Sequence, residues 1–220
     1  MELIGHRGCA MQYPENTVAA VTRAAAFVDA VEVDVRRCAS GELVVFHDET
    51  LDRLTGATGP VAEHAWTVLR ELEVLDSGES IPRLETVVGA VPDRVDLQLE
   101  LKETGLAADV RATVAGSDHD VTVSSFEPAA LAEVADLDWD VPTGYLFDEA
   151  PDESIATAQS VGCDIVHPHY DLCLSSDVVE AAHAVGLHVV AWKAARTAEE
   201  IRVLESVGVD GVTADRWDIV

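Results

Sequence analysis

Short apolar runs alternate with helix-like segments along the whole of this 220-residue sequence. Such alternation is typical of repeated βα units, which form a parallel sheet covered by helices rather than separate strand and helix domains. The apolar runs predict eight strands, over residues 2–5, 30–35, 95–101, 120–125, 142–147, 164–167, 187–192 and 209–213. We therefore predict one α/β domain over residues 1–220, a (β/α)8 TIM barrel with its active site at the carboxyl ends of the strands.

One connection is much longer than the others. Nearly sixty residues separate the second and third predicted strands, which indicates an insertion over about residues 37–94. Residues 41–48 are expected to be extended, and helix-like pieces surround Trp66 and Leu84. Long connections of this kind are usually functional or disordered. The apolar content of this one favours a functional element at the catalytic end of the barrel.

Charge excludes one class of partner. The chain has 41 acidic and 14 basic residues, a net charge of −27, and such a surface repels the phosphate backbone of nucleic acids. We interpret the acidic surface as an adaptation to a very salty cytoplasm, where salt screens the self-repulsion. The sequence leaves the oligomeric state open.

Export and membrane signals are not evident in the sequence. No apolar run approaches the roughly 18 residues of a membrane span, and the N-terminus has no basic segment followed by an apolar one. We therefore expect a cytoplasmic protein without stable membrane insertion. Its cysteines are far apart and are expected to be reduced thiols packed as small apolar groups: Cys9, Cys38, Cys163 and Cys173.

Two of the predicted strands have charged residues on one face. Because side chains alternate along a strand, residues 31–35 place Glu32 and Asp34 opposite three valines, and residues 97–101 place Glu100 opposite three leucines. Parallel barrel strands are normally apolar on both faces. We expect the valines and leucines to face the helices and the three carboxylates to converge inside the barrel mouth.

Converging carboxylates require positive charge nearby, because an unpaired buried charge is costly. Carboxylate oxygens are the ligands that a hard divalent cation such as Mg²⁺ or Ca²⁺ prefers, so the sequence predicts one metal site. The alternative is a closed network of ion pairs with Lys102, Arg36 and Arg37.

Two histidines end extended segments of this predicted site. His6 follows the first strand and His47 follows the extended part of the insertion, and two imidazoles on opposite sides of a scissile bond can serve as base and acid. Arg7 offers planar donors for phosphate oxygens, and Gly5 and Gly8 are expected to let the backbone approach a ligand closely. With a metal and a lysine, these residues indicate phosphoryl chemistry.

Several motifs occur in a fixed order along nearly the whole chain. They are H-R-G at 6–8, P-E-N-T at 14–17, E-V-D at 32–34, G-E-L-V-V-F-H-D-E-T-L-D-R at 41–53, E-L-K at 100–102, S-F at 125–126 and G-V-D-G-V-T-A-D at 208–215. In these motifs the sequence resembles the glycerophosphodiester phosphodiesterase family. The resemblance implies a (β/α)8 barrel, a divalent metal ion, and hydrolysis of a small-molecule glycerophosphodiester to glycerol phosphate and an alcohol.

Roles of individual residues also follow from the resemblance. It implies metal ligands, an acid/base pair and phosphate contacts, which are respectively Glu32, Asp34 and Glu100, then His6 and His47, then Arg7 and Lys102. Phe126 is expected at the wall of the site. Trp192 ends a late strand and is expected either to close over the glycerol moiety or to pack in the core.

The sequence departs from the family pattern twice. After Trp192 the family usually continues Thr-Val-Asn, whereas Lys193, Ala194 and Ala195 follow here, so the alcohol preference is open. Near the C-terminus the family tends toward T-D-x-P, and residues 214–217 are Ala-Asp-Arg-Trp. Neither departure replaces a predicted metal ligand or histidine.

Two other functions compete with this interpretation. A phospholipase-type phosphodiesterase on the same barrel would need apolar loops to meet a membrane, and aromatic residues are only 5% of the chain. A non-catalytic barrel could instead bind a metal or phosphoester. His167 and His169 form a pair that could bind a second metal, but the intervening proline and the lack of an acidic neighbour on that strand predict a rim position for both.

Overall fold

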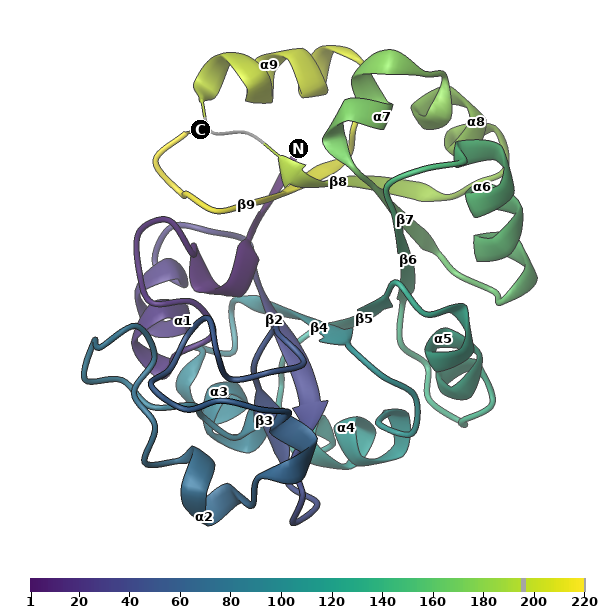
Figure 1. Ribbon diagram of the computed structural model, residues 1–220. Helices are drawn as coiled ribbons and strands as arrows, with labels where there is room; N and C mark the ends of the chain where they lie inside the picture. Colours follow the sequence, from purple (N-terminus) through teal and green to yellow (C-terminus); the bar gives the residue numbers. More distant parts are fainter. Residues whose placement is uncertain (195–196, 220) are drawn as a thin grey trace.

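The computed structural model describes residues 1–194 and 197–219. Within this part of the chain, eight parallel strands form a closed barrel surrounded by helices (Figure 1). The strands are β1 (Glu2–Gly5), β2 (Ala30–Arg37), β4 (Asp96–Leu101), β5 (Val121–Ser125), β6 (Thr143–Phe147), β7 (Ile165–Pro168), β8 (His188–Ala194) and β9 (Gly211–Ala214). Because β1 pairs with both β2 and β9, the sheet has no free edge there. The predicted TIM barrel is confirmed.

Helices follow the strands and form the outer layer (Figure 1). They are α1 (Val18–Ala24), α2 (Trp66–Leu69), α3 (Leu84–Ala90), α4 (Ala107–Val114), α5 (Pro128–Ala135), α6 (Pro151–Ser160), α7 (Tyr170–Ser175), α8 (Val178–Ala184) and α9 (Ala198–Ser206), with short 3-10 turns η1 (His6–Gly8) and η2 (Val61–Glu63). Side-chain caps mark the starts of some of these helices. Thr17 caps α1, and Thr197 with Glu200 forms a capping box on α9.

The main core lies between the strands and the helices. Val31, Val33 and Val35 of β2 are fully buried there, as are the leucines of β4. The opposite faces of β2 and β4 point into the barrel, because strand side chains alternate. The prediction that the apolar residues face the helices is therefore confirmed.

The predicted insertion after β2, called the excursion from here on, has its own small core. Its extended part contains β3 (Leu43–Val45), which pairs antiparallel with β2, with Val35 opposite Val45. Phe46, Leu54 and Ile81 belong to a separate buried cluster of the excursion. The chain then returns to the outer layer at α3, which contacts α1 and α4. This arrangement brings the segment after β3 to the carboxyl end of the barrel.

Two sequence expectations concern thiols and membranes. The four cysteines are buried and unbridged, as predicted. None of the helices in residues 1–194 and 197–219 has the length and apolarity needed to cross a bilayer.

Candidate active site

A cavity of about 330 Å³ opens at the carboxyl ends of the strands. It is lined by residues within or just after β1, β2, β4, β5, β6, β8 and β9, together with His47 from the excursion. Seven of the nine predicted site residues line this cavity: His6, Arg7, Glu32, His47, Glu100, Phe126 and Trp192. The eighth, Lys102, contacts a cluster of carboxylates beside the cavity. The ninth, Asp34, belongs to the cluster itself.

Three buried carboxylates form this acidic cluster. Glu32, Asp34 and Glu100 are 1%, 0% and 6% exposed, and each places one oxygen within 4.8 Å of the other two. The pairing of Asp34 with Glu100 in the β2–β4 register explains the convergence. One oxygen of Glu32 is buried without a hydrogen-bond partner among the described residues. The donor set fits a hard divalent cation.

Two cations partly neutralise the cluster. The Lys102 ammonium contacts Glu100 and lies 3.3 Å from Asp34 Oδ1, and Arg7 Nε lies 3.2 Å from Asp34 Oδ2. The alternative network with Arg36 and Arg37 is not formed. Arg36 donates to the His47 carbonyl and Arg37 to the carbonyls of Gly41 and Gly105.

Charge within the cluster is distributed unequally. Burial and the charge of Asp34 raise the pKa of Glu32 above its ordinary value. Burial would also raise the pKa of Asp34, but Arg7 and Lys102 outweigh it and lower that pKa. Desolvation and Asp34 raise the pKa of Glu100 as well. Asp34 is therefore the carboxylate most strongly favoured in its ionised form, and a bound cation would favour ionisation of the other two.

His6 is oriented by a residue at the other end of the chain. Its Nδ1 donates to Asp215 Oδ1 at 2.6 Å, and its Nε2 lies 4.0 Å from Glu32 Oε2. Burial lowers the pKa of His6, but the Asp215 hydrogen bond and the charge of Glu32 outweigh it and raise the pKa overall. Because Asp215 engages Nδ1, Nε2 is the ring nitrogen of His6 that remains available for a proton transfer.

His47 has a similar partner and the opposite shift. Its Nδ1 donates to Asp48 Oδ1 at 2.6 Å, and Arg53 binds the same carboxylate. Burial lowers the pKa of His47, and Arg7 and Lys102 act in the same direction. The surroundings of the two histidines thus shift their pKa values in opposite directions.

Aromatic residues form one wall of the cavity. Trp192 meets Phe126 edge-on at 5.2 Å between ring centroids and meets His169 at 4.9 Å. Its indole Nε1 donates to the Phe147 carbonyl at 3.0 Å. Trp192 is thus fixed at the rim by packing and one hydrogen bond while one surface lines the cavity. Lys193 lines the cavity too, whereas Ala195 lies outside the described residues.

Three residues that the sequence did not single out support the site. Asn16 donates from Nδ2 to Asp34 Oδ2 at 2.7 Å, and Glu15 joins Arg7 to Arg53. The P-E-N-T motif was the available signal for Glu15 and Asn16, and the T-A-D motif was the signal for Asp215. Neither motif states which side chain is contacted.

Two local predictions are wrong. Gly8 does not make room for a ligand, because a Cβ there would lie 2.8 Å from the Ala20 backbone, and its φ is +74°. Close packing on α1 requires this glycine. His167 is not at the rim but fully buried inside the barrel, because β7 directs it inward, whereas His169 caps α7.

Fold and site together define a class: a (β/α)8-barrel enzyme whose cavity combines a metal-competent acidic cluster with two carboxylate-oriented histidines. A profile of the glycerophosphoryl diester phosphodiesterase family matches residues 6–219, so the chain belongs to this family of phosphodiesterases.

Individual relatives agree with this membership. A glycerophosphodiester phosphodiesterase of Caldanaerobacter subterraneus is 29% identical, over 97% of this chain and 93% of that protein. The solved structure of an Oleispira antarctica phosphodiesterase in complex with the product sn-glycerol-3-phosphate has a TM-score of 0.91 and 26% identity, covering 100% of this chain and 95% of the other. A glycerophosphodiester phosphodiesterase of Agrobacterium tumefaciens has a TM-score of 0.86 and 26% identity, covering 100% and 98%.

Proposed function

We propose that this enzyme hydrolyses glycerophosphodiesters to glycerol phosphate and an alcohol, with one divalent cation and the pair His6 and His47. The observation that supports this most strongly is the acidic cluster, whose oxygens lie within 4.8 Å of one another in a cavity that both histidines line. The Oleispira antarctica structure is a complex with the product sn-glycerol-3-phosphate, which is a glycerol phosphate like the product proposed here.

Glu32, Asp34 and Glu100 would hold the cation, which is Mg²⁺ or Ca²⁺ by the preference of carboxylate oxygens. When bound, the cation supplies Lewis-acid stabilisation of charge on a nonbridging phosphate oxygen. Lys102 and Arg7 add positive charge on the same side of the cavity, and both are oriented by Asp34. Phe126 and Trp192 cover the ligand and limit access of bulk water.

The opposite pKa shifts give each histidine a role. Neutral His47 accepts the proton of the attacking hydroxyl, which belongs either to water or to the substrate's own glycerol. Protonated His6 donates its proton to the oxygen of the leaving alcohol. A cation bound to the acidic cluster would cancel part of the contribution of Glu32 to the pKa of His6, and the Asp215 hydrogen bond would remain. The acid role of His6 therefore depends on Asp215.

The direct test is an assay of glycerol phosphate release from a panel of glycerophosphodiesters, with Mg²⁺, with Ca²⁺ and with EDTA. We expect release in the presence of a divalent cation and its loss in EDTA. Absence of release with every head group, at low and high salt, would favour a non-catalytic binding barrel. Release that persists in EDTA would contradict the metal requirement.

Replacement of Asp215 by asparagine tests the acid role of His6. We expect kcat to fall about 100-fold or more, because an amide neither fixes the Nδ1 tautomer nor stabilises the imidazolium. The alkaline limb of the kcat profile, which requires protonated His6, should move to lower pH. Asp215→Glu should restore part of the activity. An unchanged pH profile in Asp215→Asn would contradict this role.

We also propose that the enzyme works in a salty cytoplasm. The net charge of −27 destabilises the folded chain by self-repulsion, and the Debye length falls from about 10 Å at 0.1 M salt to about 3 Å at 1 M. Thermal unfolding should therefore show a higher Tm at about 3 M KCl than at about 0.1 M. Sucrose at matched osmolarity serves as the uncharged control. Equal Tm values at the two salt concentrations would refute the adaptation.

A further inference from the structure

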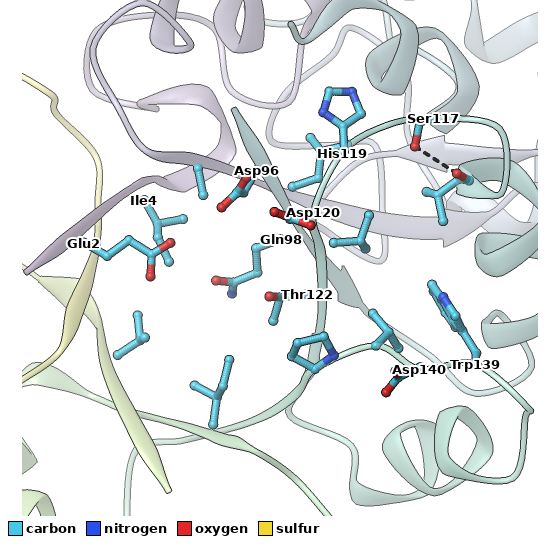
Figure 2. Close-up of a pocket in the computed structure, with 18 of the residues that line it drawn as sticks. Glu2, Ile4, Asp96, Gln98, Ser117, His119, Asp120, Thr122, Trp139 and Asp140 are labelled. Carbon is cyan, nitrogen blue, oxygen red and sulfur yellow. Dashed lines mark hydrogen bonds between the residues drawn. The ribbon is translucent and has the colours of Figure 1, made fainter. Parts of the chain in front are cut away.

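A second and larger cavity, of about 540 Å³, opens at the amino ends of the strands. Figure 2 shows its labelled lining, in which the carboxylates of Glu2 and Asp96 point toward a common space from β1 and β4. Asp120, before β5, and Asp140, before β6, add two more carboxylates to the lining. The catalytic proposal uses none of these four residues.

We call this cavity at the amino ends of the strands the lower cavity. Its electrostatics favour a cation. Burial raises the pKa of Glu2, and the charges of Asp96 and Asp29 raise it further. Burial also raises the pKa of Asp96, with Asp120 contributing in the same direction. The amino terminus and His188 act on the pKa of Glu2 in the opposite direction, as His119 does on that of Asp96, but they do not outweigh these effects. A bound cation would relieve the repulsion between the carboxylates.

The inner part of the cavity has a different character. His167 is fully buried, and neither ring nitrogen has a hydrogen-bond partner within residues 1–194 and 197–219. Burial lowers its pKa to about 3, so the imidazole is neutral and offers one donor and one acceptor. Gly144 makes space for this ring, since a Cβ there would lie 2.3 Å from Nε2.

Gln98 adds a second unsatisfied group at the same depth. Its amide donates to Ser124 Oγ at 3.1 Å, but its buried Oε1 has no partner among the described residues. A buried polar atom without a hydrogen-bond partner destabilises the fold. A ligand hydroxyl that pairs with Gln98 or His167 would recover part of this cost.

The walls between these two regions indicate an organic ligand. Ile4, Ile165 and Val190 contribute apolar surface, and Trp139 contributes an aromatic ring beside Asp140 (Figure 2). Trp139 lies across the cavity from Glu2 and Asp96 (Figure 2), so its ring forms part of the opposite wall. Three convergent metal ligands occur, among the described residues, at Glu32, Asp34 and Glu100 and not in this cavity.

We propose that the lower cavity binds a small organic ammonium ion that bears a hydroxyl group, with the ammonium near Glu2 and Asp96 and the hydroxyl at His167 and Gln98. Because His167 Nε2 lies against Gly144, this placement requires the imidazole to turn about its Cβ–Cγ bond so that a ring nitrogen meets the hydroxyl. The proposed site does not include the acidic cluster, but Gln98 lines both the lower cavity and the active-site cavity.

Calorimetric titration of the full chain with choline, in amine-free buffer containing Mg²⁺, tests the proposal. Two analogues separate the contributions: 3,3-dimethylbutan-1-ol lacks the charge and tetramethylammonium lacks the hydroxyl. We expect saturable choline binding, with the uncharged analogue at least about tenfold weaker and tetramethylammonium several-fold weaker. Equal binding of choline and the uncharged analogue, or no saturable binding at tens of millimolar, would overturn the proposal.

Variants then locate the site. Glu2→Gln should weaken choline binding about tenfold, while Glu180→Gln, the same change at an exposed position of α8, should not. His167→Leu should abolish the preference for choline over tetramethylammonium. If that variant does not fold, the comparison of analogues on the unmodified chain still decides the role of the hydroxyl.

An NMR measurement distinguishes the two cavities. The indole N–H signal of Trp139, assigned with Trp139→Phe, should shift on choline addition, and that of Trp192 should not. A shift confined to Trp192 would place the ligand in the active-site cavity and refute the proposal. Displacement of choline by added Mg²⁺ in a manner that Glu2→Gln abolishes would assign the lower cavity to a metal and would also refute it.

Discussion

Replacing either His6 or His47 by alanine is expected to lower kcat by about 10²- to 10⁴-fold, the usual contribution of a positioned acid or base. Each imidazole is oriented by its own carboxylate, at 2.6 Å in both cases, and both line the cavity beside the acidic cluster. Neither imidazole belongs to the group of predicted metal ligands. The cation-dependent rise in Tm should therefore survive in both variants.

The control for the histidine variants is His183→Ala. His183 is exposed on α8, where it pairs with Asp210, and its loss should leave kcat near the wild-type value. In the double variant, His6→Ala with His47→Ala, the losses should not multiply, because residues that act in one proton-transfer unit are not additive. Turnover near the wild-type rate in either single variant would contradict the pair.

Replacing Glu32 by glutamine is expected to change stability in opposite directions with and without metal. In EDTA the variant should be more stable than the wild type by roughly 2 kcal/mol at pH 8, because it no longer buries a carboxylate beside Asp34. With Mg²⁺ at about 100 times its Kd, the wild type should gain about 2.7 kcal/mol, or roughly 5 to 10 °C in Tm, and the variant should gain little.

The sign of the pH dependence follows from the raised pKa of Glu32. The folded protein retains the proton at a pH where the unfolded chain has lost it, so stability of the metal-free wild type falls as pH rises from the ordinary glutamate pKa toward the raised one. The advantage of Glu32→Gln in EDTA should be absent near pH 4 and should grow toward pH 8. Glu180→Gln is the matched control. If Glu32→Gln is less stable than the wild type in EDTA, the buried carboxylates of the acidic cluster do not repel one another.

Much of the barrel was predictable because its signals are local. Alternation along β2 and β4 assigns Glu32, Asp34 and Glu100 to the inner face whatever surrounds them, and the apolar partners of these residues to the helices. The positions of His6 and His47 after extended segments placed both histidines at the carboxyl end. The antiparallel pairing of β3 with β2 then brings His47 near the cluster.

Contacts between distant segments were not predictable from these signals. Asp215 lies 209 residues from His6, and their meeting depends on the pairing of β1 with β9 as the barrel closes. Asn16 reaches Asp34 only because the loop after β1 folds over the barrel mouth. The sequence interpretation assigned Arg36 to a possible network with the carboxylates, but packing of the excursion directs its guanidinium to the His47 carbonyl.

The sequence by itself therefore determined the barrel, the inward face of each charged strand and the residues of the predicted catalytic centre, because hydrophobic periodicity and strand alternation act within a few residues. Only the tertiary structure decided the partner of His6, the tight packing of Gly8 against α1 and the burial of His167 above an acidic lower cavity. These features depend on closure, register and loop packing, which join residues that no local pattern connects.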